Sequence, residues 1–158
     1  MLKKLIFATT LLLLGSGIAS AKPARYVLDK QHSSILFSIS HLGFSNTIGM
    51  FRDFDGTFTF DEDKPLDSEA DVTIKTGSLD MGDEAFNKEM RSKLWMNTDK
   101  YPEITFKSSQ IKYTKGTEAQ VRGWVTFLGQ THSEVFDVKF NKAGDNIATG
   151  NYVAGFSA

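Results

Sequence analysis

The sequence predicts an all-β chain that contains one short α-helix. Apolar residues recur at every second position along most of the chain after residue 33, which is typical of strands with one buried face. Short polar or glycine-containing segments separate these runs at intervals of about ten residues. A helical spacing of apolar residues occurs between residues 83 and 95. Together these observations predict an antiparallel meander, folded as a barrel or a sandwich, with a single helix.

The alternating runs are short and well separated. In the first run, Ile35, Phe37 and Ile39 alternate with small or polar residues. Similar runs lie at 54–60, 72–74, 104–106, 121–127, 136–140 and 152–156. Segments 61–65, 114–116, 128–131 and 141–145 carry turn residues, so we expect loops or hairpin turns there.

The predicted helix runs from Asp83 to Trp95. Phe86, Met90 and Leu94 recur every four residues and would share one apolar face. Asp83 is suited to cap the first turn, and Asn97 would stop the helix. Such a helix would plug one end of a barrel or form a lid over a cavity.

Length and composition exclude several classes of protein. The 158 residues suit a single domain with a hydrophobic core. A net charge of −1 leaves no basic excess for neutralising phosphates, so nucleic acid is not an expected partner. The absence of cysteine excludes disulfides, thiolate metal sites and cysteine nucleophiles. Phenylalanine is frequent, at 13 residues, which indicates a core or cavity built from rings.

The N-terminus has the pattern of a cleaved signal peptide. Lys3 and Lys4 precede an apolar run, and Ala19-Ser20-Ala21 matches the small-residue cleavage pattern. We therefore expect residues 1–21 to be a signal peptide and residues 22–158 to be the mature domain. The expected location is the bacterial periplasm, without stable membrane insertion after cleavage.

Several segments resemble the YceI family in order and spacing. The first block comprises YVLD at 26–29, HSSILFSISHLG at 32–43, GMF at 49–51 and FDG at 54–56. The second comprises MRS at 90–92, KYPEITFKS at 100–108, GWVTFLGQT at 123–131 and AGF at 154–156. The resemblance implies a secreted or periplasmic, lipocalin-like up-and-down barrel that binds a polyisoprenoid or an isoprenoid quinone, and that is not an enzyme.

The chain departs from the family pattern at three places. His132-Ser133 replaces a basic residue followed by proline, and Glu89 stands where histidine is common. Family members also continue well beyond the AGF block, so we expect a barrel that is incomplete at its C-terminus. Exposed strand edges would then allow a homodimer.

The candidate ligand-binding residues are mainly the rings that alternate on single strand faces. From the pattern alone, these rings form either a dry core or an apolar channel; the resemblance favours a channel. His41 is a candidate for contact with a ligand head group. Arg91 would either bind the head group or clamp the helix to the barrel rim. The complete set is Phe37, Ile39, His41, Phe58, Phe60, Arg91, Phe106, Phe127, Phe136 and Phe140.

Other functions have weaker support in the sequence. Trp95 and Trp124 could stack on sugars in a carbohydrate-binding β-module. For a small hydrolase, the chain offers no G-x-S-x-G elbow, and the adjacent His32 and Ser33 would face apart on a strand. For a metal site, His32 and His41 are nine residues apart and would lie on opposite strand faces, so they could not bind one ion without a sharp bend. We therefore expect no catalytic residues, no metal site and no cofactor apart from a noncovalent lipid ligand.

Overall fold

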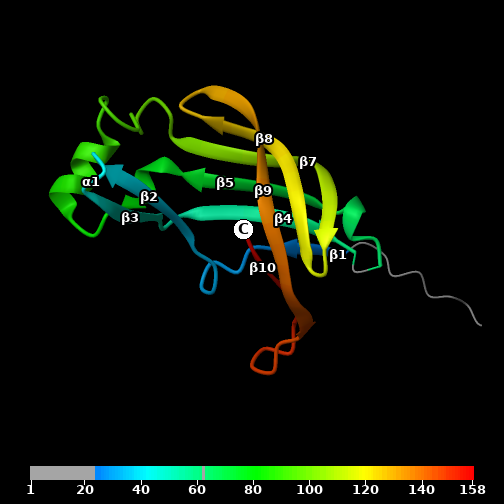
Figure 1. Cartoon of the computed structure of the whole chain (residues 1–158). Coiled ribbons are helices and arrows are strands. Elements are labelled where there is room, and N and C mark those ends of the chain that lie inside the picture. The colour runs from blue at the N-terminus through cyan, green and yellow to red at the C-terminus, as the bar shows by residue number, and fades with distance from the viewer. Residues whose placement is uncertain (1–23, 62) are drawn as a thin grey trace, which may run out of the picture.

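The computed structural model describes residues 24–61 and 63–158 (Figure 1). The expected signal peptide therefore lies outside the described residues. The strands are β1 Ala24–Val27, β2 Ile35–His41, β3 Ser45–Phe51, β4 Phe54–Phe60, β5 Glu69–Lys75, β6 Leu79–Asp80, β7 Glu103–Lys115, β8 Glu118–Phe127, β9 Gln130–Asp145 and β10 Tyr152–Ser157. The α-helix is α1, Glu84–Arg91, and short 3₁₀ turns lie at Pro65–Asp67 and Thr76–Ser78.

The strands form two antiparallel sheets that curve into a nearly closed barrel (Figure 1). The larger sheet has the order β1-β4-β5-β7-β8-β9-β10, and the smaller has the order β2-β3-β6. The predicted all-β barrel with one helix is confirmed. One detail differs from a simple meander, because the β2–β3 hairpin separates β1 from its partner β4.

Aromatic contacts across the interior hold the larger sheet in its curled form. The ring of Phe60 on β4 lies 5.5 Å from that of Phe140 on β9 and 5.1 Å from that of Phe156 on β10, between centroids. Phe140 and Phe156 are also 5.5 Å apart. Since β4 is the second strand of the sheet and β10 the last, these contacts join its two ends.

Helix α1 packs over the opposite end of the barrel and is shorter than the sequence predicts. The expected N-cap is confirmed, because the Asp83 carboxylate accepts a hydrogen bond of 2.9 Å from the Phe86 amide. The helix ends at Arg91, so the predicted extension to Trp95 is wrong. There the chain folds back, and the Met96 amide donates to the Met90 carbonyl at 3.0 Å. Leu94 is consequently 90% exposed instead of packed.

The buried core lies beneath this helix. Phe51, Leu79, Met81, Met90 and Met96 form its centre. Partly buried apolar residues of β2, β5, β7 and α1 pack around it: Ile35, Phe37, Ile39, Ile74, Ile104 and Phe86. This end of the barrel is therefore solidly filled. No helix among the described residues is long and apolar enough to cross a membrane.

Of the three hairpin turns that the sequence predicts, two are confirmed and one is wrong. Leu128 and Gly129 both have positive φ, 49° and 74°, as a tight two-residue turn between β8 and β9 requires. Gly116 likewise turns the chain between β7 and β8. The predicted turn at 141–145 is wrong, because this segment belongs to β9 and pairs with β10. An irregularity in the pairing near Gly155 interrupts the alternation that the sequence pattern relies on.

Buried glycines allow rings to lie flat on the sheets. A Cβ atom at Gly123 would lie 2.2 Å from the Phe106 ring and 2.5 Å from the Lys107 carbonyl oxygen. At Gly49 it would lie 2.4 Å from the Phe37 ring. Each glycine therefore makes room for the aromatic side chain of the neighbouring strand.

We expect Gly123→Ala to destabilise the fold, because the added methyl group collides with both the Phe106 ring and fixed backbone. Overpacking of this kind costs about 1–3 kcal/mol, or about 3–10 °C in melting temperature for a domain of this size. Gly77→Ala is the matched control, since nothing lies within 4 Å of its added Cβ. Equal melting temperatures for the two variants, measured by circular dichroism, would contradict the close packing.

Asp80 connects β6 to Arg52, the residue that follows β3, and to α1. Its carboxylate accepts hydrogen bonds from Gly82 N–H at 2.9 Å and from Arg52 Nε and Nη2 at 3.0 and 2.9 Å. Asn87 Nδ2 also donates a hydrogen bond to the Asp80 carboxylate, at 3.4 Å. The Oδ1 atom of Asn87 accepts a hydrogen bond from the buried Met81 amide. The hydrogen bonds to its carboxylate hold the pKa of Asp80 below its ordinary value; the one from the Gly82 amide has the largest effect, and those from Arg52 and Asn87 come next.

This lowered pKa predicts a loss of stability in acid. Because the folded pKa lies below the unfolded value of about 3.9, the stabilisation is complete above that value and is lost as the pH falls through the folded pKa. We expect Asp80→Asn to be less stable than the wild type at pH 7, with the two free energies of unfolding converging as the pH falls through the folded pKa of Asp80. Asp71→Asn, on exposed β5 surface, is the control. A difference that stays constant from pH 7 to pH 3 would disprove this role.

Candidate functional site

The register of the strands determines which side chains face the barrel interior. Phe106 on β7 is opposite Val125 on β8, and Val121 on β8 is opposite Phe136 on β9. The Phe106 and Phe136 rings meet edge to face, with centroids 5.1 Å apart. Residues that alternate with these positions point outward, as Trp124 and Val135 do.

Eight of the ten candidate residues lie on these inner faces. Phe58 and Phe60 share a face of β4 with the buried Phe54, and Phe37 and Ile39 contact the core beneath α1. Phe127, Phe136 and Phe140 follow the parity of Phe106 on their strands. The eight are Phe37, Ile39, Phe58, Phe60, Phe106, Phe127, Phe136 and Phe140.

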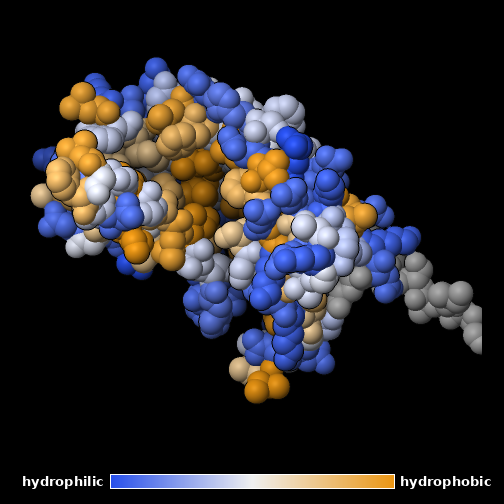
Figure 2. All heavy atoms as spheres, viewed as in Figure 1, coloured by the Kyte–Doolittle hydropathy of each residue, from blue (hydrophilic) through white to orange (hydrophobic). Residues whose placement is uncertain are grey.

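An apolar recess opens between the two filled ends of the barrel. Figure 2 shows it lined by hydrophobic residues, and in the same view of Figure 1 it lies over β4 and β5, between β2 and β9. The inward-facing Phe127 and Phe136 are each 40% exposed, whereas Phe51 and Phe54 are 8% and 5% exposed. The rings thus form packed clusters at the ends and an accessible apolar surface between them.

The two remaining candidates occupy different positions. Arg91 donates from Nη2 to the Leu79 carbonyl at 2.7 Å, and its Nη1 lies 3.7 Å from the Glu84 carboxylate. This arrangement agrees with the clamp interpretation, because it ties α1 to β6. His41 is exposed at the end of β2, opposite Ser45.

The other histidines have local partners. His32 Nδ1 lies 2.7 Å from the Asp29 carboxylate, a hydrogen bond that lowers the pKa of Asp29. His132 Nε2 lies 3.3 Å from Gln130 Oε1. Within residues 24–61 and 63–158, no group of three or more histidine or acidic side chains could hold a metal ion.

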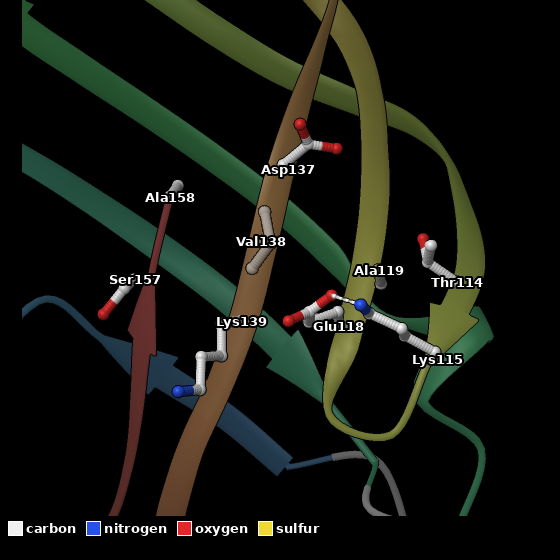
Figure 3. A pocket seen from close by; sticks show the side chains of 9 residues that line it. All are labelled: Thr114, Lys115, Glu118, Ala119, Asp137, Val138, Lys139, Ser157 and Ala158. Atoms are coloured by element: carbon white, nitrogen blue, oxygen red, sulfur yellow. Dashed lines mark ion pairs between the residues drawn. The ribbon is translucent and has the colours of Figure 1, made fainter.

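A second, charged depression lies at the C-terminal edge (Figure 3). Its volume is about 560 Å³, and its rim carries Asp137, Lys139 and the ion pair of Lys115 with Glu118, at 3.8 Å. Of the inner-face residues, Ala119 and Val138 border it, but none of the candidate rings does.

The tryptophans that could stack on a sugar lie apart, and the carboxylate pair Asp53 and Asp55 is engaged in ion pairs. Trp124 is 54% exposed on the outer face of β8, whereas Trp95 lies in the loop after α1. Asp53 and Asp55 share Lys30 as an ion-pair partner, at 3.7 and 3.2 Å. The Gly56 amide and Lys30 lower the pKa of Asp55, so this carboxylate is ionised and not poised as an acid.

The sequence reasoning missed three polar residues on the inner face of β9. Gln130, His132 and Glu134 have the same parity as Phe136 and Phe140, and they pair with Phe127, Val125 and Gly123 of β8. The sequence does contain a signal for them, because residues 130, 132 and 134 are separated from Phe136 by even numbers of positions and therefore share its strand face. On β9 the prediction selected the aromatic positions and passed over the polar ones.

The YceI-like domain family profile matches residues 26–158, which is every described residue except 24 and 25. The chain belongs to the YceI family. It is 40% identical to the UPF0312 protein of Pectobacterium atrosepticum over 160 residues, covering 100% of this chain and 82% of the relative. The family resemblance predicted from the sequence is thereby confirmed.

Solved structures share the YceI fold. Burkholderia cenocepacia BcnA is 29% identical, with a TM-score of 0.70 over 74% of this chain and 73% of BcnA. A polyisoprenoid binding domain from Saccharophagus degradans, implicated in plant cell wall breakdown, has a TM-score of 0.51 at 16% identity, over 77% of this chain and 69% of that domain. At that identity the likeness shows the fold alone.

Proposed function

We propose that this YceI-family chain is a binding protein that holds a polyisoprenoid, an isoprenoid quinone or a similar amphiphilic lipid, noncovalently, in its apolar recess. The observation that carries the proposal is the exposure of Phe127 and Phe136, 40% each, on an inward-facing surface. A ligand with a long apolar tail would cover rings that the protein itself leaves accessible. The role is sequestration or transport of the lipid, without catalysis.

The energetics of burial favour a ligand with a long apolar tail. Burial of apolar surface contributes about 25 cal/mol per Å², so covering about 400 Å² gains about 10 kcal/mol. Part of this gain offsets the loss of translational and rotational freedom on binding. Rings are well suited as partners, because they offer large areas and lose few rotamers. The polyisoprenoid-binding description of the Saccharophagus degradans domain, which has the same fold, is consistent with this ligand class.

Location and assembly belong to the same proposal. The N-terminal pattern supports export to the periplasm, with residues 22–158 as the mature domain. Among the described residues, β2 pairs with β3 only, and it contains no proline, lysine or acidic residue. A free edge of this kind supports a homodimer.

The most direct test compares two neighbouring positions on β9. Phe136 and Val135 are 40% and 42% exposed, and they lie on the inner and outer faces of the same strand. We expect Phe136→Asp to weaken binding of geranylgeraniol, a C20 prenol, at least about tenfold, because a carboxylate would face the tail in the recess. Val135→Asp should bind as the wild type does. Titration calorimetry measures both affinities.

Equal affinity in the two variants would contradict the recess as the binding site. If a glycan binds instead and Trp124→Ala abolishes that binding, the carbohydrate-binding alternative is favoured. Turnover that disappears in His41→Ala or His132→Ala would favour a hydrolase.

A further inference from the structure

The inner face of β9 changes from polar to apolar along its length. Gln130, His132 and Glu134 come first, and Phe136, Val138 and Phe140 follow on the same face. The neighbouring face of β8 carries Ala119, Val121, Gly123, Val125 and Phe127, so it contains no polar side chain. The polar residues are therefore specific to one strand and one end of the apolar surface.

The geometry places these polar groups next to the rings of the recess. Glu134 is opposite Gly123, and the Phe106 ring lies over that glycine and contacts Phe136. His132 is opposite Val125, which in turn is opposite Phe106. The carboxylate and the imidazole thus border the aromatic contact between β7 and β9.

The polar row offers hydrogen-bond acceptors and a negative charge. All three side chains are exposed, and Glu134 has no ion-pair partner within 4.0 Å in the described part of the chain. When His132 Nε2 donates to Gln130 Oε1, its Nδ1 is left as an acceptor. The nearby Arg122 points to the outer face, where its Nη1 donates to Ser133 at 3.4 Å. Lys100 lies 5.0 Å from the centroid of the Tyr101 ring, which packs against Gly129 at the hairpin turn.

We infer that Gln130, His132 and Glu134 form the head-group subsite of the recess, and that they select an uncharged, hydroxyl-bearing head group over a phosphate or diphosphate ester. This inference rests on the proposed function and adds the head-group class to it. A lipid lying along β9 places its tail over Phe136 in the recess, in the direction of the packed Phe140 ring, and its head beside Glu134 and His132. A hydroxyl group donates to these acceptors, whereas a diphosphate meets the carboxylate with a like charge.

The test uses two probes with the same C20 tail, geranylgeraniol and geranylgeranyl diphosphate. We expect the wild-type chain to bind the alcohol at least about tenfold more tightly than the diphosphate. Glu134→Gln should reduce this preference several-fold by strengthening diphosphate binding, because it removes the charge and keeps the shape. Asp137→Asn removes an equal charge from the outer face of the same strand and should leave the preference unchanged.

The outcomes separate the two levels of the proposal. Equal affinity of the wild type for both probes, or a preference that Glu134→Gln does not change, overturns the head-group subsite and leaves the recess as the tail site. A change of equal size in Asp137→Asn also overturns it, since the charge then acts through the general field of the protein. If neither probe binds the wild type, the proposed function and the subsite both fail.

Discussion

The contact of Phe60 with Phe140 and Phe156 is the interaction on which this architecture depends. It joins β4 to β9 and β10, which lie near opposite ends of one hydrogen-bonded sheet. An open seven-stranded sheet would expose the same rings to water on one face. By bringing that face together, the three rings create an interior, and every side chain of matching parity becomes an inward-facing residue. The recess follows from this closure.

Closure divides the interior into regions with different roles. Beneath α1, the methionine-rich cluster with Phe51 and Leu79 is buried and contributes stability. At the other end, the Phe60 cluster holds the sheet in its curve. Between them, Phe127 and Phe136 keep two fifths of their surface accessible. Because this apolar area stays in contact with water, it contributes little to the free energy of unfolding. A lipid ligand would cover it and would raise the stability of the folded chain by mass action.

Much of this organisation is readable from the sequence, because strand parity is a local property. The alternation of Phe58 with threonine, or of Phe136 and Phe140 with Asp137 and Lys139, predicts the inner faces without knowledge of the fold. The failures occur where tertiary contacts override the pattern. Leu94 continues a helical period, yet the chain folds back when the Met96 amide bonds to the Met90 carbonyl. Segment 141–145 has turn composition, but pairing with β10 extends β9 through it. Arg91 binds the Leu79 carbonyl of β6, and no local sequence pattern predicts that this carbonyl lies within its reach.

On this account, the nearly closed barrel encloses a lipid site. Native mass spectrometry of the protein purified from cells, followed by organic extraction of the bound material, tests it most directly. The account predicts a bound apolar mass that is released only on unfolding and carries an isoprenoid tail with an uncharged head group. A folded, monodisperse protein that carries no lipid, and takes none up from added prenols or quinones, would contradict it.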